Sequence, residues 1–408
     1  MSRGDGDKSM TEIRRLTSGL NQSGVRAYNE RLILTMLQRN GPMAGRDLAR
    51  QSGLSPQTVS VILRKLQADE MVLRGAPQRG KVGKPSVPVA LNPDGLFSVG
   101  LKIGRRSADL ALMDFTGEIR AQYRLGYRYP MPADVFAFLR DGLDAALGSL
   151  PADLRTRVSG IGVAAPFELW NWHDLVGAPA EAFAEWKHVD FQAEVAAFTD
   201  LPVLVVNDAT AACRAELVYG IGKHFRDYAY VFLGAFIGGG IVLNHLVVEG
   251  QFGNAGSLGS LPLPSPDGKI VQLIDVASIY SLEGRVVAAG GDSQALWSMP
   301  QDWTPFEDQV APWIDQTGRA LAQACLAACA VIDFEAVLVD GALPQPIRAR
   351  LVDRIRAEIP HLDARGLIQP RVEEGHIGAN ARAIGAACGP MIAAVLLDEF
   401  SLFSQDRS

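Results

Sequence analysis

Apolar side chains in the first part of the chain recur at helical spacing in short segments. The segments cover residues 25–39, 44–51 and 55–69, and in the first and third the apolar positions lie mostly three or four residues apart, as along one face of a helix. Gly41-Pro42 ends the first segment, and a Gly-containing turn at 52–54 separates the second from the third. Three short helices joined in this way predict a helix-turn-helix.

The third segment has the features of a helix that reads DNA. Ser55 is a favourable N-cap, and Pro56 fits the first helical position, where its missing N–H is not needed. The face opposite the apolar stripe is polar and basic, and polar groups near the N-terminus of such a helix can contact base edges in the major groove. The candidate DNA-binding residues here are Ser55, Gln57, Thr58, Ser60, Arg64 and Lys65.

Residues 71–93 alternate short β-type runs around a tip rich in Gly, Arg and Lys, which predicts a β-wing. A basic tip with small residues can approach phosphates or enter the minor groove. Arg79, Lys81 and Lys84 are therefore further candidates for DNA contact. The alternative is that the helices and the charged hairpin form a small protein-interaction domain.

Beyond residue 95 the pattern changes to β-type runs that alternate with helical segments, which is typical of an α/β fold. A predicted hairpin, with Thr116-Gly117 near a turn, opens a sheet. A strand pair hinged on a Gly-rich turn begins a second, similar half, and an Ala-rich helix covers 313–331. Other strands are expected at 158–166, 201–208 and 336–343. This repetition predicts two similar lobes with a cleft between them.

The charge balance separates the same two parts of the chain. Residues 1–95 hold 15 Lys and Arg against 8 Asp and Glu, a net of +7, whereas the remaining 313 residues hold 24 against 37, a net of −13. Phosphate binding requires basic side chains concentrated on one surface. Nucleic-acid contact is therefore expected from the N-terminal part alone.

Several features bear on the cellular compartment. No apolar run approaches the ~20 residues that span a bilayer, and the N-terminus has no apolar signal region. The four cysteines (Cys213, Cys325, Cys329 and Cys388) are few and scattered. These features predict a cytoplasmic protein with free thiols.

Asn207-Asp208 lies where a ligand site is expected in an open α/β sheet, at the end of an apolar strand and the start of a helix. An Asp at this point can accept hydrogen bonds from sugar hydroxyls or act as a base on one of them. The pair is also a common helix cap. The residues alone favour neither interpretation.

Five segments together resemble one family. They are GKVGKPSVPVALNP after the third helix, VVNDATAACRAELVYGIG, FLGAFIGGGIVLNHLVVEGQFGNAGSLGS, VDGALPQP and IGANARAIGAA. In these segments the chain resembles the ROK family, which groups repressors of sugar-utilisation genes with sugar kinases. The resemblance implies an actin-like (ribonuclease H-like), two-lobed, duplicated α/β body and a homodimer or dimer of dimers.

The chain departs from the family's kinases at both phosphate turns. An Asp-Leu-Gly-Gly-Thr turn is replaced by Lys102-Ile103-Gly104-Arg105-Arg106, which removes an acidic partner for Mg²⁺-phosphate and adds bulk near the backbone. A Gly-Thr-Gly-Ile-Gly-Gly-Gly turn becomes Gly234–Gly240 with Phe236 in place of glycine. Kinase activity is not expected, although Asp208 stands where the resemblance places the kinase base.

The family's sugar and zinc chemistry is altered as well. Its Asn-Ala-Gly-Glu-Ile-Gly-His segment reads Asn254-Ala255-Gly256-Ser257-Leu258-Gly259-Ser260, and no Cys or His follows in 261–283 to hold a tetrahedral zinc. We therefore expect no metal and no cofactor. The resemblance leaves Asn207, Asp208, Asn254, Ser257 and Ser260 as candidates for binding a sugar-like effector, unless the site is vestigial.

The sequence thus predicts a flexible arm (1–23), a winged helix-turn-helix DNA-binding domain (24–95) and a body (96–408) with lobes of about 96–208 and 209–390. The predicted function is a transcriptional regulator, with repression favoured, that binds a double-stranded DNA operator and a sugar-like effector. A sugar kinase with an N-terminal extension and an effector-independent DNA-binding protein are the alternatives.

Overall fold

The computed structural model describes residues 22–77, 87–173, 177–264 and 268–397. The predicted arm (1–23) lies almost wholly outside this range, as do the three candidates at the wing tip, Arg79, Lys81 and Lys84. None of the described helices is long and apolar enough to cross a membrane.

The N-terminal part is a winged helix-turn-helix, as predicted. Ser55 begins the third helix, because its side chain accepts a hydrogen bond from the Thr58 N–H at 3.1 Å. Gly53 makes the preceding turn in the left-handed conformation, with φ of 72°. The elements are α1 (Gln22–Asn40), β1 (Met43–Ala44), α2 (Gly45–Ser52), α3 (Pro56–Ala68), β2 (Val72–Arg74) and β3 (Pro88–Leu91), and the antiparallel strands are ordered β1-β3-β2.

The body contains two five-stranded sheets of the same topology. The first has the order β6-β5-β4-β7-β8 and the second β11-β10-β9-β14-β15, each with three antiparallel strands followed by two parallel ones. The strands are β4 (Phe97–Ile103), β5 (Ser107–Asp114), β6 (Ile119–Gly126), β7 (Val158–Ala165), β8 (Val203–Asn207), β9 (Tyr228–Leu233), β10 (Ile237–Leu243), β11 (Leu246–Val248), β14 (Ala336–Gly341) and β15 (Arg371–Glu374). This repetition confirms the predicted duplicated, actin-like body.

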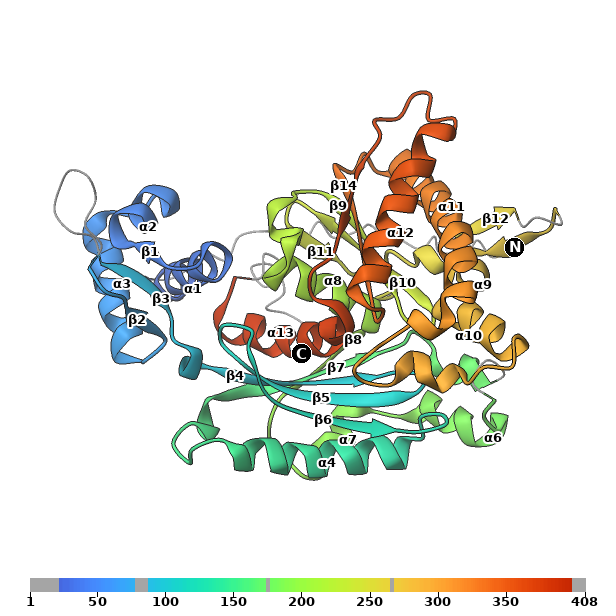
Figure 1. Cartoon of the computed structure of the whole chain (residues 1–408). Coiled ribbons are helices and arrows are strands. Elements are labelled where there is room, and N and C mark those ends of the chain that lie inside the picture. The colour runs from blue at the N-terminus through green and yellow to red at the C-terminus, as the bar shows by residue number, and fades with distance from the viewer. Residues whose placement is uncertain (1–21, 78–86, 174–176, 265–267, 398–408) are drawn as a thin grey trace, which may run out of the picture.

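Helices cover both sheets (Figure 1). The remaining helices are α4 (Pro132–Ser149), α6 (Ala180–Phe183), α7 (Phe191–Ala196), α8 (Asp208–Tyr219), α9 (Leu273–Ala277), α10 (Ile279–Ala288), α11 (Glu307–Val331), α12 (Gln345–Glu358) and α13 (Ala381–Val395), and a small pair, β12 (Pro262–Pro264) and β13 (Ile270–Gln272), lies beside them. Helix α4 lies along one face of the first sheet and α13 packs on the other, whereas α8 packs between α13 and the strands β9 and β10 of the second sheet. The Ala-rich helix α11 begins six residues earlier than the sequence pattern predicts.

Helix α13 comes from the end of the chain but packs on the first sheet. A Cβ on Gly100 of β4 would lie 2.0 Å from the Ala383 carbonyl oxygen, and one on Gly162 of β7 would lie 1.8 Å from that of Ala386. Only glycine permits this approach of strand and helix backbones. The lobe boundary drawn from the sequence, which places residues up to 390 in the second lobe, does not anticipate this return.

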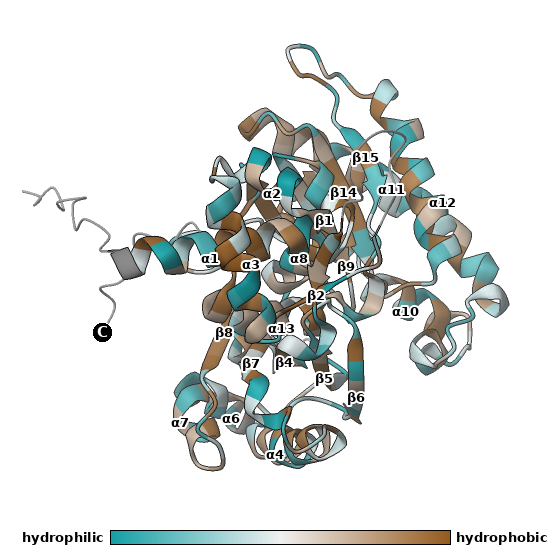
Figure 2. Ribbon diagram, turned by 90° about the vertical axis from the view of Figure 1, so that its left-hand side faces the viewer, coloured by the Kyte–Doolittle hydropathy of each residue, from teal (hydrophilic) through white to brown (hydrophobic). Residues whose placement is uncertain are grey.

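The DNA-binding domain shares a hydrophobic core with the body. Buried side chains of α1 and α3 belong to the same cluster as Met113 and Phe115 of the first sheet and Cys388 and Met391 of α13. Helix α1 lies between the two parts, because it contacts both α3 of the DNA-binding domain and α8 of the body, and in Figure 2 the ribbon of α3 is largely hydrophobic on the side that faces α1 and the body. The domain is therefore packed against the body rather than only tethered to it.

Candidate nucleic-acid interface and effector site

Helix α3 buries one face and exposes the other. Val59, Ile62, Leu63 and Leu66 are buried, whereas Gln57, Ser60 and Arg64 are exposed. Val61 lies on the same open face and is 44% exposed. The exposed face therefore combines hydrogen-bonding, basic and apolar groups, which are the kinds of side chain that contact base edges.

Two of the candidates also build the start of the helix. The Ser55 Oγ lies 2.8 Å from the Thr58 Oγ1 and accepts the Thr58 N–H. Thr58 is accordingly half-buried, while Ser55 stays exposed. Their hydroxyls fix the end of the helix that would enter a groove.

Lys65 is engaged within the protein. Its ammonium lies 2.7 Å from the Glu30 carboxylate on α1 and 3.2 Å from that of Asp69. The hydrogen bond to Glu30 is the main cause that raises the pKa of Lys65 above its usual value. This lysine therefore ties the recognition helix to α1, whereas the Arg64 side chain, among the described residues, donates only to the Ser60 carbonyl of its own helix, at 3.3 Å.

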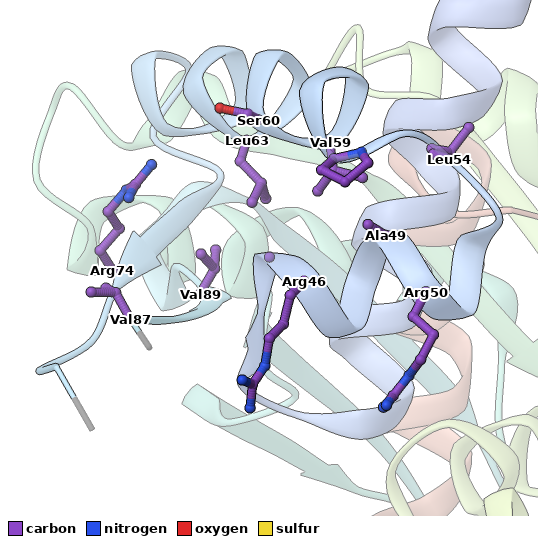
Figure 3. Close-up of a pocket in the computed structure, with 12 residues that line it drawn as sticks. Arg46, Ala49, Arg50, Leu54, Val59, Ser60, Leu63, Arg74, Val87 and Val89 are labelled. Atoms are coloured by element: carbon purple, nitrogen blue, oxygen red, sulfur yellow. The ribbon is translucent and has the colours of Figure 1, made fainter. Parts of the chain in front are cut away.

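Three arginines that sequence reasoning missed lie beside α3. Arg46 and Arg50 of α2 and Arg74 of β2 line a groove of about 530 Å³ whose floor includes Leu63 and Val89. Figure 3 shows the Arg46 and Arg50 guanidinium groups pointing the same way from α2. The signal was present, because two arginines four residues apart in a predicted helix share one face.

At the end of β8, the side chains of Asn207 and Asp208 make different contacts. The Asn207 Oδ1 accepts the backbone N–H groups of Ala209 and Thr210, at 2.9 and 3.1 Å, so this residue is the N-cap of α8. The Asp208 carboxylate accepts a hydrogen bond from the Arg382 Nη1 of α13 at 3.1 Å, and both side chains are largely buried. Arg382 also lies over the Phe232 ring, 4.9 Å from its centre.

The remaining effector candidates form a separate group. The Ser257 Oγ donates to the Asn254 Oδ1 at 2.7 Å, whereas Ser260 is exposed on the next turn. No hydrogen bond or ion pair among the described residues joins this group to Asp208. The structure therefore brings the five candidates together as two sets, not as one closed site.

The first phosphate turn is occupied by the protein's own ion pairs. The buried Lys102 lies 2.8 Å from the Asp109 carboxylate. Burial, and then the charge of Arg382, lower the pKa of Lys102 to about 8. Lys102, Arg105 and Arg106 of this turn each contact a carboxylate.

Arg105 and Arg106 both contact Glu283 of α10 in the second lobe. Arg105 Nη1 and Arg106 Nη2 lie 3.1 and 2.6 Å from its carboxylate, and the Trp297 N–H donates to it at 2.7 Å. Phe236, the residue that departs from the second phosphate turn, lies 5.7 Å below the Arg105 guanidinium. The residues that differ from the kinase pattern at the two phosphate turns, Arg105 and Phe236, thus contact each other at the boundary between the lobes.

Comparisons with known proteins agree with this architecture. Residues 98–272 match the ROK family model, and residues 26–72 match the winged helix-turn-helix DNA-binding model. The chain carries a ROK family domain behind an N-terminal winged helix-turn-helix. The ROK match covers the first sheet and the beginning of the second.

The relatives of this chain include an uncharacterized protein and a repressor. The chain is 28% identical to an uncharacterized protein of Sinorhizobium fredii, over 90% of this chain and 92% of that one. It is 24% identical to the xylose repressor of Bacillus subtilis over 59% of this chain, a match that spans 62% of the repressor.

Solved structures support the fold. A ROK family transcriptional regulator, described as a homolog of the Escherichia coli MLC protein, matches with a TM-score of 0.63 and 21% identity, over 90% of this chain and 96% of that one. A ROK family glucokinase from Streptomyces griseus, solved with glucose and AMPPNP, matches with a TM-score of 0.56 and 20% identity, over 72% of this chain and 98% of that one. The regulator match extends over the DNA-binding domain as well as the body.

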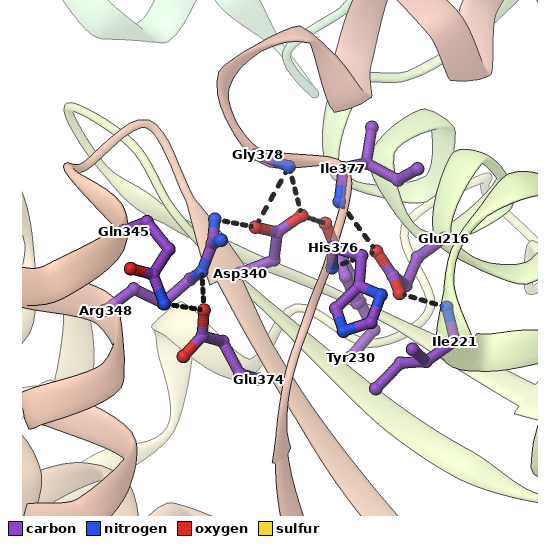
Figure 4. A network of polar contacts seen from close by, with 10 residues as sticks. All are labelled: Glu216, Ile221, Tyr230, Asp340, Gln345, Arg348, Glu374, His376, Ile377 and Gly378. Carbon is purple, nitrogen blue, oxygen red and sulfur yellow. Dashed lines mark hydrogen bonds and ion pairs between the residues drawn. The ribbon is translucent and has the colours of Figure 1, made fainter.

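The late turn, which resembles the ROK nucleotide turn, is likewise occupied by hydrogen bonds and ion pairs of the protein's own side chains (Figure 4). Asp340, at the end of β14, accepts the Arg348 Nη1 at 2.9 Å, the Tyr230 hydroxyl at 3.1 Å and the Gly378 N–H at 2.9 Å. Nearby, Glu216 of α8 accepts backbone N–H groups of His376 and Ile377. Burial, and then the charge of Asp340, raise the pKa of Glu216. Both carboxylates hold the segment that leads into α13.

Among the described residues, no group of three His, Cys, Asp or Glu side chains is placed to hold a metal ion. The cysteines Cys213, Cys325, Cys329 and Cys388 are free and buried.

Proposed function

We propose that this ROK-family chain is a DNA-binding transcriptional regulator, with repression as the expected outcome, that responds to a sugar-like small molecule bound by its body. The observation that carries the proposal is the exposed face of α3, where Gln57, Ser60 and Arg64 stand open beside the groove lined by Arg46 and Arg50. Hydrogen-bonding groups on the helix would contact bases, and the flanking guanidinium groups would contact phosphates.

We also propose that the body performs no phosphoryl transfer. Lys102, Arg105 and Arg106 make internal ion pairs at the first phosphate turn, and the carboxylate of Asp208, where a kinase base would stand, already pairs with Arg382. A base must be able to reach the proton it abstracts, and triphosphate binding requires access to backbone amides. These contacts support a sensing role over the kinase alternative.

A homodimer would place two α3 helices in successive major grooves of a pseudo-palindromic operator. Half-sites would then be separated by about one helical turn of DNA or a multiple of it, roughly 10 base pairs. The effector site would draw on Asp208, next to the α8 N-cap Asn207, and on the second set of candidates, Asn254, Ser257 and Ser260. A lining of amide, hydroxyl and carboxylate groups suits a neutral polyol or sugar.

Selection of duplexes from a random pool, followed by mobility-shift titration, tests DNA binding. A selected duplex should be bound by the wild-type chain and lost or altered in Gln57→Ala, whereas Arg365→Ala, on the body surface, should bind as wild type. Failure to enrich any duplex would contradict the proposed function.

Calorimetry against neutral sugars and sugar phosphates, with and without ATP, tests the body. Heat from a neutral sugar without ATP is the expected result. A coupled assay that finds hexose-dependent ATP turnover near ~1 s⁻¹, the low end for enzymes, would instead restore the kinase alternative.

A further inference from the structure

Helices α8 and α13 begin at the same ion pair. Asp208 is the first residue of α8 and Arg382 the second of α13, and their charged groups lie 3.1 Å apart. The Arg382 Nε is buried and has no hydrogen-bond partner among the described residues. A buried donor without a partner is costly, so an acceptor oxygen brought by a ligand at this point would be bound favourably.

The two helices touch backbone to backbone along their length. A Cβ on Gly385 of α13 would lie 1.6 Å from the Ala211 carbonyl oxygen of α8. Interiors packed this closely shift as units, since no space allows one element to move alone. A displacement of Arg382 therefore moves α13 together with α8.

The far ends of both helices are held by α1 of the DNA-binding domain. The Arg31 guanidinium donates to the carbonyl oxygens of Ala393, Ala394 and Leu396 at the end of α13, at 3.0 to 3.1 Å. The Gln38 side chain donates to the Val218 carbonyl of α8 at 2.7 Å. These carbonyls have no partner within a helix, and a cation is favourable at this end of the helix dipole.

The last link reaches the recognition helix. The Leu397 N–H donates to the Thr35 hydroxyl of α1 at 2.9 Å. Glu30, next to Arg31, carries the ion pair to Lys65 of α3 at 2.7 Å. The chain of contacts thus runs from the cleft, along α13, through α1 to α3, with a charged hydrogen bond at each junction.

We propose that Arg382 is a ligand-contacting residue of the effector site and that α8 and α13 carry its displacement to the DNA-binding domain, with Arg31 as the positioning residue at the far end. The ligand chemistry that fits is a neutral polyol, which can donate hydroxyl protons to Asp208 and offer an oxygen to the Arg382 Nε. A ligand shifts DNA binding by this route only if it binds the two helix positions with different affinity. The predicted effect on DNA binding rests on the proposed function, whereas the predicted displacement of α8 and α13 does not.

The test uses the full chain without any ligand. Asp208→Asn removes the charge that holds Arg382 and is expected to change hydrogen exchange of the Leu397 amide and the amides of α1. The matched control is Asp315→Asn, which breaks a 2.8 Å ion pair with Arg354 between α11 and α12 and should leave those amides unchanged. Unchanged exchange in folded Asp208→Asn would overturn the proposal, and Arg382→Lys provides the same test if Asp208→Asn does not fold.

A double-mutant cycle on a selected duplex adds the second readout. Asp208→Asn is expected to change the dissociation constant for DNA by roughly 5-fold or more, the lower range of allosteric coupling. In an Arg31→Gln background the same substitution should have a clearly smaller effect, because the last carbonyls of α13 then lose their charged contact with α1, while the Thr35 and Gln38 contacts remain. Equal effects in both backgrounds would overturn the route through Arg31. If the wild-type chain selects no duplex, the proposed function fails. The hydrogen-exchange experiment still decides whether α8 and α13 transmit a change at Asp208 to α1.

Discussion

Single side chains decide what the recognition helix can distinguish. Val61 is 44% exposed on α3, between Gln57 and Arg64 on the exposed face. A lone exposed valine needs no explanation on most surfaces. Here it stands where an apolar group would meet the methyl group of thymine, beside Gln57, whose amide suits adenine.

We therefore predict that Val61 contacts a thymine methyl. Replacing one thymine of a selected half-site by deoxyuridine should weaken binding of the wild-type chain by about 0.8 kcal/mol, the free energy of burying one such group, or roughly 4-fold. In Val61→Ala the same DNA change should have no effect. Titration of every thymine position in turn, by mobility shift, checks this, and an unchanged response to deoxyuridine in Val61→Ala would assign the methyl contact to another residue.

The buried Lys102 should make stability depend on pH. Its pKa is about 8 in the folded chain against 10.5 ordinarily. Between these values the unfolded chain holds more protons than the folded one, so the contribution of Lys102 to stability rises with pH. Denaturation by urea between pH 7 and 10 should show this rise in the wild-type chain relative to Lys102→Met, and parallel curves for the two proteins would contradict it.

Residue-scale contacts were predictable from sequence only where both partners are close in the chain. Ser55 and Asn207 cap helices through amides two or three residues away, and cap chemistry identifies such residues. Asp208 and Arg382 are 174 positions apart, and Arg105 and Glu283 are 178 apart. No local pattern specifies pairs of this kind, because they follow from how the two lobes fold together.

At the scale of elements, α2 and α3 present different chemistry to DNA. Arg46 and Arg50 are largely exposed on α2, and Arg74 borders the same groove from β2. Guanidinium groups arranged beside a recognition helix suit phosphate oxygens, which fix position rather than sequence. Both arginines contact Asp47 of α2, at 3.7 and 3.1 Å, but their side chains stay about three-quarters exposed, whereas Lys65 of α3 is 39% exposed and pairs with Glu30 at 2.7 Å.

We predict that Arg46→Ala and Arg50→Ala each reduce the slope of log affinity against log salt by about 0.9, the value for one phosphate contact. Lys65→Met should change the slope less and should lower stability, because it leaves Glu30 without its ammonium partner. Salt titrations of the three variants on one selected duplex separate these outcomes. A full unit of slope lost in Lys65→Met would show that this lysine contacts a phosphate after all.

Elements of strong pattern were predictable, and those of weak pattern were not. The strands 336–341 and 158–165 are mostly apolar, with runs such as Ala336–Val339, and their helices and turns follow in order. Strand β15, Arg371–Glu374, has one buried side chain and three charged residues, so its place at the edge of the second sheet leaves no apolar signal. The return of α13 to the first sheet depends on Gly100 and Gly162. The sequence does not show that these two glycines allow close packing of a helix that is more than 200 residues away in the chain.

At the scale of the whole molecule, one contact spans the two lobes where a nucleotide would lie in an enzyme of this fold. Glu283 of the second lobe has a side chain only 5% exposed and faces Arg105 and Arg106 of the first. The Tyr280 ring lies 4.5 Å from the Arg105 guanidinium and extends the contact. Such a largely buried ion pair holds the two lobes of the body together at this point.

Neutralising Glu283 should therefore weaken the whole fold. Glu283→Gln keeps the shape but leaves two largely buried guanidinium groups facing an amide, and removal of one partner from a buried ion pair costs about 3–5 kcal/mol. Glu307→Gln is the matched control, since its pair with Arg350 is half-exposed, and exposed pairs contribute at most about 1 kcal/mol. Urea denaturation of both variants measures the difference. Equal losses in the two variants would mean that the lobes are held together by packing alone.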